Sequence, residues 1–166
     1  PGQKHPVHYH KVKDVTFLSV NIVSRRIKVS PKSMKKFKEK VRLLTKRNNP
    51  HSMKYIIDKL NEYLRGWLGY FRIQELSSLF KKLDMWIRNR LRSMQLKKWK
   101  KPKKFQQELR KAGFYLRESN KIWVRMKRWR SVNRKEVRTL LNLEWFRKDG
   151  LFFLNDYSPN PLKVKL

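Results

Sequence analysis

Residues 60–73 read LNEYLRGWLGYFRI, and this stretch decides the fold. Its large apolar side chains recur at steps of three and four residues: Leu60, Leu64, Trp67, Leu68 and Phe71. This spacing puts them on one broad face of an α-helix, which turns by about 100° per residue. The stretch therefore predicts a central helix with one face buried in a core.

One flank of the same helix carries a row of polar and charged residues, Lys54, Asn61, Arg65 and Arg72. Steps of seven, four and seven residues keep this row in register. Because the row lies beside the apolar face, we expect its cations to contribute to binding rather than to folding. Two glycines near the back of the helix allow two interpretations, incidental weak points or close approach of another chain or nucleic acid: Gly66 and Gly69.

Positive charge is the extreme property of this composition. The 166 residues include 44 Lys and Arg against 12 Asp and Glu, which gives a net charge of +32. Such a charge favours a polyanionic partner, and nucleic acid is the first candidate because neutralised phosphates release counterions. An anionic membrane surface is the competing target, but it favours one amphipathic basic helix. Here the cations are spread along the whole chain.

Composition also limits the class of protein. Apolar residues make up 39% and aromatic residues 13% of the chain, with six Trp, so one domain with a packed core is expected. The absence of Cys excludes disulfides and thiolate metal sites, and fits an intracellular protein. No apolar run reaches the length of a membrane span, and no signal peptide is visible. Pro1 at the start indicates a chain that is processed, trimmed or cut from a longer one.

The residues before the central helix predict an arm, a hairpin and a first helix. Residues 1–13 lack periodicity, and their three His are interpreted as part of a flexible arm rather than a metal site: His5, His8 and His10. Within 14–29, the β-branched runs VTFLSVNIV and RIKVS predict two strands around a tight turn. Ser30 and Pro31 then mark a helix start, as a cap followed by proline.

Three antiparallel helices with short connections are expected to form the core at residues 30–96. Ser52 and Ser77 are predicted to cap the second and third helices. Arg90 projects into the apolar stripe of the third helix, so we expect it to bind a carboxylate or helix-end carbonyl groups. Arg88 and Arg92 are predicted to point outward. The predicted core contains Phe37, Val41, Leu60, Leu64, Trp67, Phe71, Leu83, Trp86 and Ile87.

A basic extension is predicted at residues 97–157, followed by an unstructured tail at 158–166. It opens with KKWKKPKK at 97–104, which is either a solvated linker or a backbone-binding patch in which Trp99 stacks on bases. The second interpretation is favoured, since a linker needs no Trp. Helices are expected at 105–112 and 136–147. The fold class is therefore mainly α, a three-helix bundle after a short hairpin with further short helices behind it.

Three blocks in order carry a resemblance to a known family: SPKSMKKFKEKVRLLTKR at 30–47, LNEYLRGWLGYFR at 60–72 and LDMWIRNRLR at 83–92. They resemble the maturase-specific domain, also called thumb or X, of group II intron reverse transcriptases, whose central pattern is close to LN-x-YLRGW-x-x-YFR. The resemblance covers about residues 17–157, with the specific motifs confined to 30–92. One departure is Phe17-Leu18-Ser19-Val20, where the family usually has Phe-Leu-Gly and an aromatic residue.

The resemblance implies an RNA-binding domain without a polymerase site of its own. The family places its metal-binding acidic residues in a palm, partly in a Tyr-x-Asp-Asp turn, and this chain has no such turn. No Gly-rich phosphate loop or catalytic triad pattern is present either. We therefore expect no enzyme activity by this chain alone, no metal site and no cofactor.

The favoured interpretation is a maturase-like domain that binds group II intron RNA and stabilises its fold for splicing. The alternatives are the thumb of a split or truncated reverse transcriptase, which would join a separate palm chain and grip an RNA–DNA duplex, and a general basic nucleic-acid-binding protein. A bacterial cytoplasm or an organelle would be its compartment. The predicted RNA-binding residues are Lys35, Lys38, Arg42, Lys46, Arg47, Lys54, Arg65, Arg72, Arg88, Arg92, Lys97, Lys98, Trp99, Lys100, Lys101, Lys103, Lys104, Arg125 and Arg128.

Overall fold

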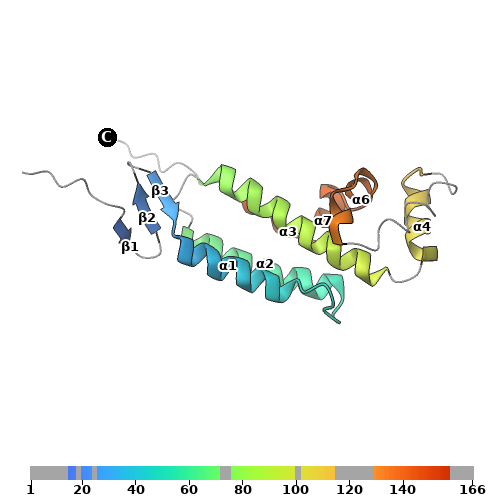
Figure 1. The fold of residues 1–166 in the computed structure, drawn as a ribbon, viewed down its shortest axis with the longest axis horizontal. Helices are drawn as coiled ribbons and strands as arrows, with labels where there is room; N and C mark the ends of the chain where they lie inside the picture. The colour runs from blue at the N-terminus through green and yellow to red at the C-terminus, as the bar shows by residue number, and fades with distance from the viewer. Residues whose placement is uncertain are drawn as a thin grey trace, which may run out of the picture.

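Three long helices run side by side along the length of the molecule (Figure 1). They are α1 (Pro31–Leu44), α2 (Met53–Phe71) and α3 (Ser77–Lys98). A small sheet lies at one end, α4 lies at the other, and the last helices lie against α3. The computed structural model describes residues 15–17, 20–23, 26–71, 76–99, 102–114 and 129–157. The predicted mainly α fold class is confirmed.

The sheet precedes α1 and consists of three antiparallel strands, β1 (Val15–Phe17), β2 (Val20–Val23) and β3 (Arg26–Val29). The predicted hairpin corresponds to β2 and β3, in which Val20 pairs with Val29 and Val23 with Arg26. The first run was predicted as one strand, but Phe17 pairs with Val20 and the chain reverses between them.

The starts of the first two helices are set by local signals. Ser30 caps α1, where its Oγ accepts a 3.2 Å hydrogen bond from the backbone N–H of Ser33. Ser52 caps α2 in the same way, with 3.2 Å from its Oγ to the backbone nitrogen of Tyr55. The predicted cap of α3 is wrong. Ser77 is the first residue of that helix, and Leu76 takes the cap position because its carbonyl accepts the 2.8 Å bond from Phe80 N–H.

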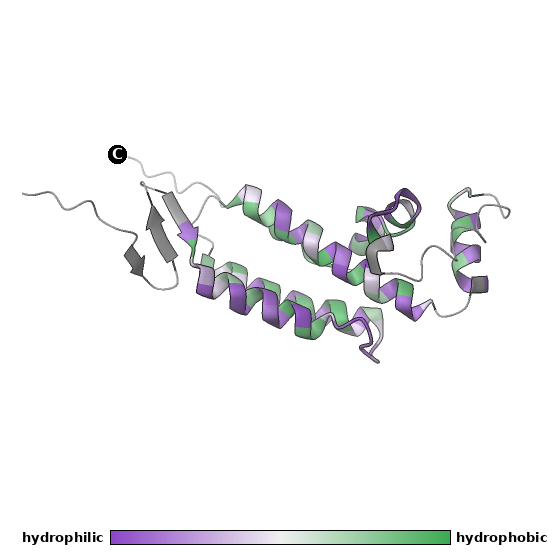
Figure 2. Ribbon diagram, in the orientation of Figure 1, coloured by the Kyte–Doolittle hydropathy of each residue, from purple (hydrophilic) through white to green (hydrophobic). Residues whose placement is uncertain are grey.

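The three long helices share one apolar core (Figure 2). Seven of the predicted core residues are buried: Phe37, Val41, Leu60, Leu64, Phe71, Leu83 and Ile87. The other two, Trp67 and Trp86, are partly buried and pack against this core. Trp67 stands between Phe37 and Phe71, with ring centroids 4.4 and 4.6 Å away. The apolar periodicity therefore predicted the core, and only the depth of the two Trp side chains differs.

The C-terminal part consists of short elements. They are α4 (Pro102–Lys111), the 3-10 helix η1 (Trp129–Asn133), α6 (Lys135–Leu140), α7 (Leu143–Lys148) and the 3-10 helix η2 (Leu154–Asp156). Gly113 follows α4 with a φ of 84°, the left-handed conformation that suits glycine after a helix.

The single helix predicted at 136–147 is instead divided into α6 and α7. Asn142 causes the break, because its Oδ1 accepts a 2.8 Å hydrogen bond from the backbone N–H of Trp145 and so caps α7. The helix α7 ends at Lys148, one residue beyond the predicted end, and Gly150 follows with a φ of 83°.

Residues 150–155 are attached to the long helices by two polar side chains. On α2, Asn61 Nδ2 donates to the carbonyl oxygen of Gly150 at 2.7 Å, and Asn61 Oδ1 accepts from Phe152 N–H at 2.8 Å. On α3, the buried Asp84 carboxylate accepts from the backbone N–H groups of Leu154 and Asn155. The C-terminal segment is therefore part of the same packed unit as the three-helix core.

Several predictions fall outside the described residues. They concern the arm at 1–13 with its three His, the tail at 158–166, and the RNA-binding assignments of Arg72, Lys100, Lys101, Arg125 and Arg128.

Candidate nucleic-acid interface

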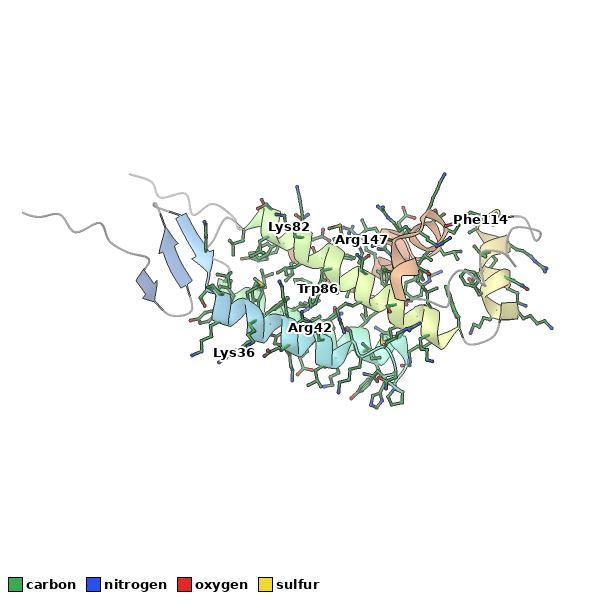
Figure 3. The ribbon with its side chains drawn as sticks, in the orientation of Figure 1. Lys36, Arg42, Lys82, Trp86, Phe114 and Arg147 are labelled. Atoms are coloured by element: carbon green, nitrogen blue, oxygen red, sulfur yellow. The ribbon has the colours of Figure 1, made fainter. Side chains whose placement is uncertain are left out.

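The outer face of α1 carries a dense set of cations. The helix contains five Lys and one Arg against a single acidic residue, Glu39. Lys35 and Arg42 are exposed, and Figure 3 shows Lys36 pointing away from the body of the protein. Among the residues that the structure describes, no carboxylate forms an ion pair with a lysine of α1. This face therefore keeps its positive charge available for an anionic partner.

The ion pairs of the described residues lie elsewhere on the surface: Lys54–Asp58, Lys59–Glu62, Lys111–Glu108 and Arg147–Asp156. Their side chains are largely solvent-exposed, so each pair stabilises the fold by at most about 1 kcal/mol. These pairs neutralise only a few of the cations, and an excess of positive charge remains on the surface.

The predicted RNA-binding residues differ in their exposure. Those with exposed side chains are Lys35, Arg42, Lys46, Lys54, Arg65, Lys97, Lys103 and Lys104. Those that are half-buried are Lys38, Arg47, Arg88 and Lys98. Arg92 and Trp99 are buried. Most of the residues that were predicted from their charge to lie on the surface are therefore at least partly exposed. The prediction of exposure is wrong where another element covers the side chain.

The row of polar and charged residues on the flank of α2, which we call the flank row, has a structural role that was not predicted from its charge. Asn61, in the middle of the row, binds the backbone at Gly150 and Phe152. The Arg65 guanidinium lies over the Phe152 ring, 4.9 Å from its centroid. Asn61 and Arg65 therefore also hold the C-terminal segment, while the expected contribution of the row's cations to binding stays a prediction.

Arg90 has the structural role that the sequence predicted. Its Nε donates to Thr45 Oγ1 at 2.6 Å, and its Nη2 donates to the carbonyl oxygens of Thr45 and Arg42 at 3.1 and 3.3 Å. These carbonyls belong to the last turn of α1, which has no further helical N–H groups to bind them. Burial lowers the pKa of the Arg90 guanidinium, and the charge of Arg42 lowers it further.

Arg92 was predicted to point outward, and this is wrong. Its side chain is only 6% exposed, and it lies 5.8 Å from the centroid of the Phe146 ring. Nε donates to the carbonyl oxygen of Leu141 at 2.9 Å, and Nη1 donates to Asn89 Oδ1 at 2.9 Å. The reason is that α6 and α7 pack over this side of α3, a contact that the three-helix prediction did not include.

Trp99 was predicted to offer its ring for stacking on bases, and this is also wrong. The indole is 6% exposed and packs against Phe105 of α4, with ring centroids 5.6 Å apart. Trp99 thus joins α3 to α4 through the core. The neighbouring Lys98 donates from Nζ to the carbonyl oxygens of Asn49 and His51, so it also holds the loop between α1 and α2.

A groove of about 390 Å³ lies where the end of α1, α3 and η1 meet. The half-buried Trp86 contributes its ring, and Figure 3 shows Trp86 together with Arg42 between α1 and α3. The guanidinium carbon of Arg42 lies 5.9 Å and that of Arg90 lies 5.6 Å from the ring centroid. The groove thus combines an aromatic ring with cations and with the polar side chains of Asn89 and Asn133.

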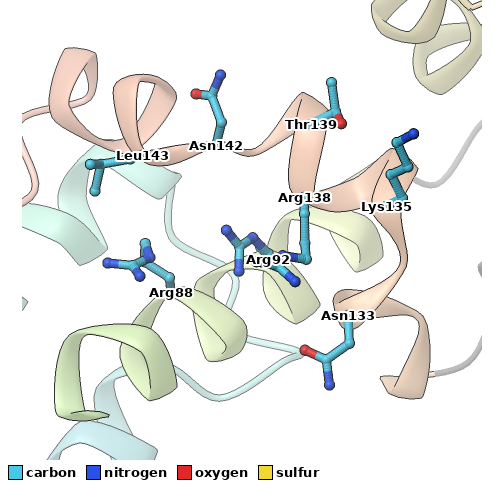
Figure 4. A pocket seen from close by; sticks show the side chains of 8 residues that line it. All are labelled: Arg88, Arg92, Asn133, Lys135, Arg138, Thr139, Asn142 and Leu143. Atoms are coloured by element: carbon cyan, nitrogen blue, oxygen red, sulfur yellow. The ribbon is translucent and has the colours of Figure 1, made fainter. Parts of the chain in front are cut away.

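On the other side of η1, a second cavity of about 490 Å³ opens between α3 and α6 (Figure 4). We refer to it as the cation pocket, and it is lined by Arg88, Arg92, Asn133, Lys135, Arg138, Thr139, Asn142 and Leu143. Four of these eight residues are cationic and none is acidic. The arrangement suits an anion that can accept several hydrogen bonds at once.

Sequence reasoning missed the contribution of α6 to this pocket. Lys135 and Arg138 were not among the predicted binding residues, although a spacing of three residues on a helix puts both on one face. This face lies against α3, where Arg92 donates a hydrogen bond to the carbonyl oxygen of Leu141. The two residues are 49 positions apart, so no local sequence pattern predicts the contact.

Across the described ranges, no group of three or more His, Asp or Glu side chains could hold a metal ion. In the same part of the chain, no helix is both long and apolar enough to span a membrane.

Comparison with known families supports the resemblance. Residues 34–113 match the model of the group II intron maturase-specific domain. The match begins in α1, covers α2 and α3, and ends after α4, so the predicted resemblance is confirmed over this range. Residues 133–143, which contribute the far wall of the cation pocket, lie beyond it. No match to a curated protein was found.

Proposed function

We propose that this chain, whose residues 34–113 match the group II intron maturase-specific domain, binds group II intron RNA and stabilises its folded form during splicing. The RNA would supply the reacting groups and the metal ions for splicing. The protein would contribute binding energy and would act without a polymerase site of its own.

The observation that carries this proposal is the cationic face of α1, four of whose five lysines lie within the matched range. Its five lysines lack carboxylate partners among the described residues, so they can neutralise phosphates without first breaking an ion pair. Each contact with a phosphate releases a counterion from the RNA, and this gain is independent of sequence.

Specificity requires contacts of another kind. The groove to which Trp86 contributes its ring and the cation pocket lie on the two sides of η1. Both are lined by Asn133. Grooves with an aromatic ring and polar side chains suit unpaired bases, which RNA presents in its loops and bulges. A folded intron RNA would therefore offer both the phosphates and the unpaired bases that suit this surface.

A splicing assay at low magnesium tests the proposal. A group II intron precursor RNA splices slowly when Mg²⁺ is too scarce to stabilise its fold, and the wild-type protein should raise the spliced fraction. The variant Lys35→Gln/Lys46→Gln removes two exposed cations and should require more protein for the same effect. If the wild-type protein leaves the spliced fraction unchanged at every concentration, the proposed function is wrong.

A further inference from the structure

The cation pocket has two walls that come from distant parts of the sequence. Arg88 and Arg92 rise from α3, and Arg138 reaches toward them from α6 (Figure 4). Lys135 contributes a fourth cation from the first turn of α6. The pocket exists only in the folded chain, because its two walls are held together by the bond from Arg92 Nε to the carbonyl oxygen of Leu141.

Within the described part of the chain, the charge of this pocket is balanced only in part, by the attraction between Arg88 and the Asp84 carboxylate. No acidic residue lines it, and the nearby carboxylate of Asp84 already accepts the N–H groups of Leu154 and Asn155. The pKa of the Arg92 guanidinium is lowered to about 10, mainly by burial and then by the charges of Arg88 and Arg138. Three arginines thus repel one another across a small cavity, and an anion would relieve that repulsion.

We infer that the cation pocket binds a phosphate group of the RNA backbone. This inference rests on the proposed function and extends it to residues 129–157, beyond the range of the family match. It also assigns a binding role to Lys135 and Arg138, which the sequence did not suggest.

A phosphate group suits the donors of the pocket. Arginine presents two parallel N–H groups that match two oxygens of a phosphate, and such charge-assisted bonds are about twice as strong as neutral ones. Asn133, Thr139 and Asn142 add neutral polar groups around the cations. Arg92 is fixed by two hydrogen bonds from Nε and Nη1, so little side-chain entropy is lost when it meets a ligand.

The first experiment asks whether the pocket binds an anion and uses inorganic pyrophosphate as the probe. Thermal unfolding is measured with pyrophosphate and with sodium chloride at equal ionic strength. Saturating pyrophosphate should raise the Tm of the wild-type protein by roughly 2–4 °C or more. The pocket variant Lys135→Gln/Arg138→Gln changes two exposed side chains of α6 and should lose most of this rise.

A matched control separates the pocket from general screening of the positive charge. The variant Lys82→Gln/Arg110→Gln removes the same number of charges from exposed positions outside both the cation pocket and the cationic face of α1, and it should keep the full rise. Equal rises in the pocket variant and the control would overturn the inference. Arg88→Gln alone is a second pocket variant, in case the double substitution unfolds α6.

The second experiment compares affinities for a group II intron RNA. The pocket variant should lose at least about tenfold more affinity than the control, because it loses charge-assisted hydrogen bonds as well as charge. If both lose affinity equally, the pocket does not bind the RNA, while the proposed function stands. If the wild-type protein binds this RNA no better than a scrambled one, the proposed function fails, and the pyrophosphate result then decides whether the pocket is an anion site.

Discussion

The carboxylate of Asp84 accepts a 3.0 Å hydrogen bond from the backbone N–H of Leu154, 70 residues further along the chain. The same carboxylate binds Asn155 N–H at 2.9 Å through its other oxygen. A carboxylate that accepts two N–H groups at the start of η2 serves as a cap supplied by another helix. This contact joins the C-terminal segment to α3, and it therefore supports the far wall of the cation pocket.

Replacing Asp84 by Ala should destabilise the protein by about 1–3 kcal/mol, because two backbone N–H groups lose their acceptor in a buried place. Urea unfolding measures the loss. Asp58→Ala is the control, since Asp58 forms an exposed pair with Lys54 and should cost less than about 1 kcal/mol. Equal losses in the two variants would show that the segment does not depend on Asp84.

The pH dependence of stability offers a separate test of Asp84. Burial raises the pKa of this carboxyl in the folded state, and the hydrogen bonds from Asn155 and Leu154 oppose that rise only in part. The stabilisation linked to this shift is present below the unfolded pKa and is lost as pH rises through the folded pKa. The unfolding free energy of the wild type minus that of Asp84→Asn should therefore fall from about pH 3 to about pH 7, because only the wild type loses this stabilisation. A difference that grows over this range would mean that the hydrogen bonds outweigh burial.

Arg90→Lys should lower stability without a specific effect on RNA. Lysine cannot reproduce the fork of bonds to Thr45 Oγ1 and to the carbonyls of Thr45 and Arg42, so a loss of about 1–3 kcal/mol is expected. Arg110→Lys, an exposed change on α4, should have almost no effect in urea unfolding. An unchanged midpoint for Arg90→Lys would contradict its assigned role.

Trp67→Ala should destabilise the core by about 3 kcal/mol, at the low end for such a change because the ring is only partly buried. The loss comes from the contacts with Phe37, Phe71 and Phe80. Met85→Ala, at a side chain that is 53% exposed, should stay within about 0.5 kcal/mol. If Trp67→Ala weakened RNA binding but unfolded at the wild-type midpoint, the assignment of Trp67 to the core would be wrong.

Local patterns were sufficient for the helices and most of the core. Ser30 and Ser52 act as caps within three residues of their partners, so sequence alone could identify them. Arg90 was also predictable, because a cation inside an apolar stripe needs a polar partner. These inferences depend only on helical spacing and on the chemistry of one residue at a time.

The errors at Arg92 and in the flank row of α2 share one physical cause, which is packing between distant segments. Arg92 is buried by Leu141, 49 residues away, and Asn61 binds Phe152, 91 residues away. A cation on an amphipathic helix looks the same in the sequence whether solvent or a later helix covers it. For the same reason, the exposed position of Lys135 and Arg138 opposite α3 could not be anticipated, and the cation pocket was not found from the sequence.

The most direct test of the central claim compares two RNAs over a range of salt concentrations. A labelled group II intron RNA and a scrambled RNA of equal length are titrated with the wild-type protein from low to near-physiological salt. Both affinities should fall, with a slope of about −0.7 to −0.9 in log K against log salt for each neutralised phosphate. The intron RNA should keep its preference as salt rises, because stacking and shape contacts are screened less than phosphate contacts. Curves that coincide at every salt concentration would contradict the claim, since they would leave only the general attraction of a protein with a net charge of +32 for any RNA.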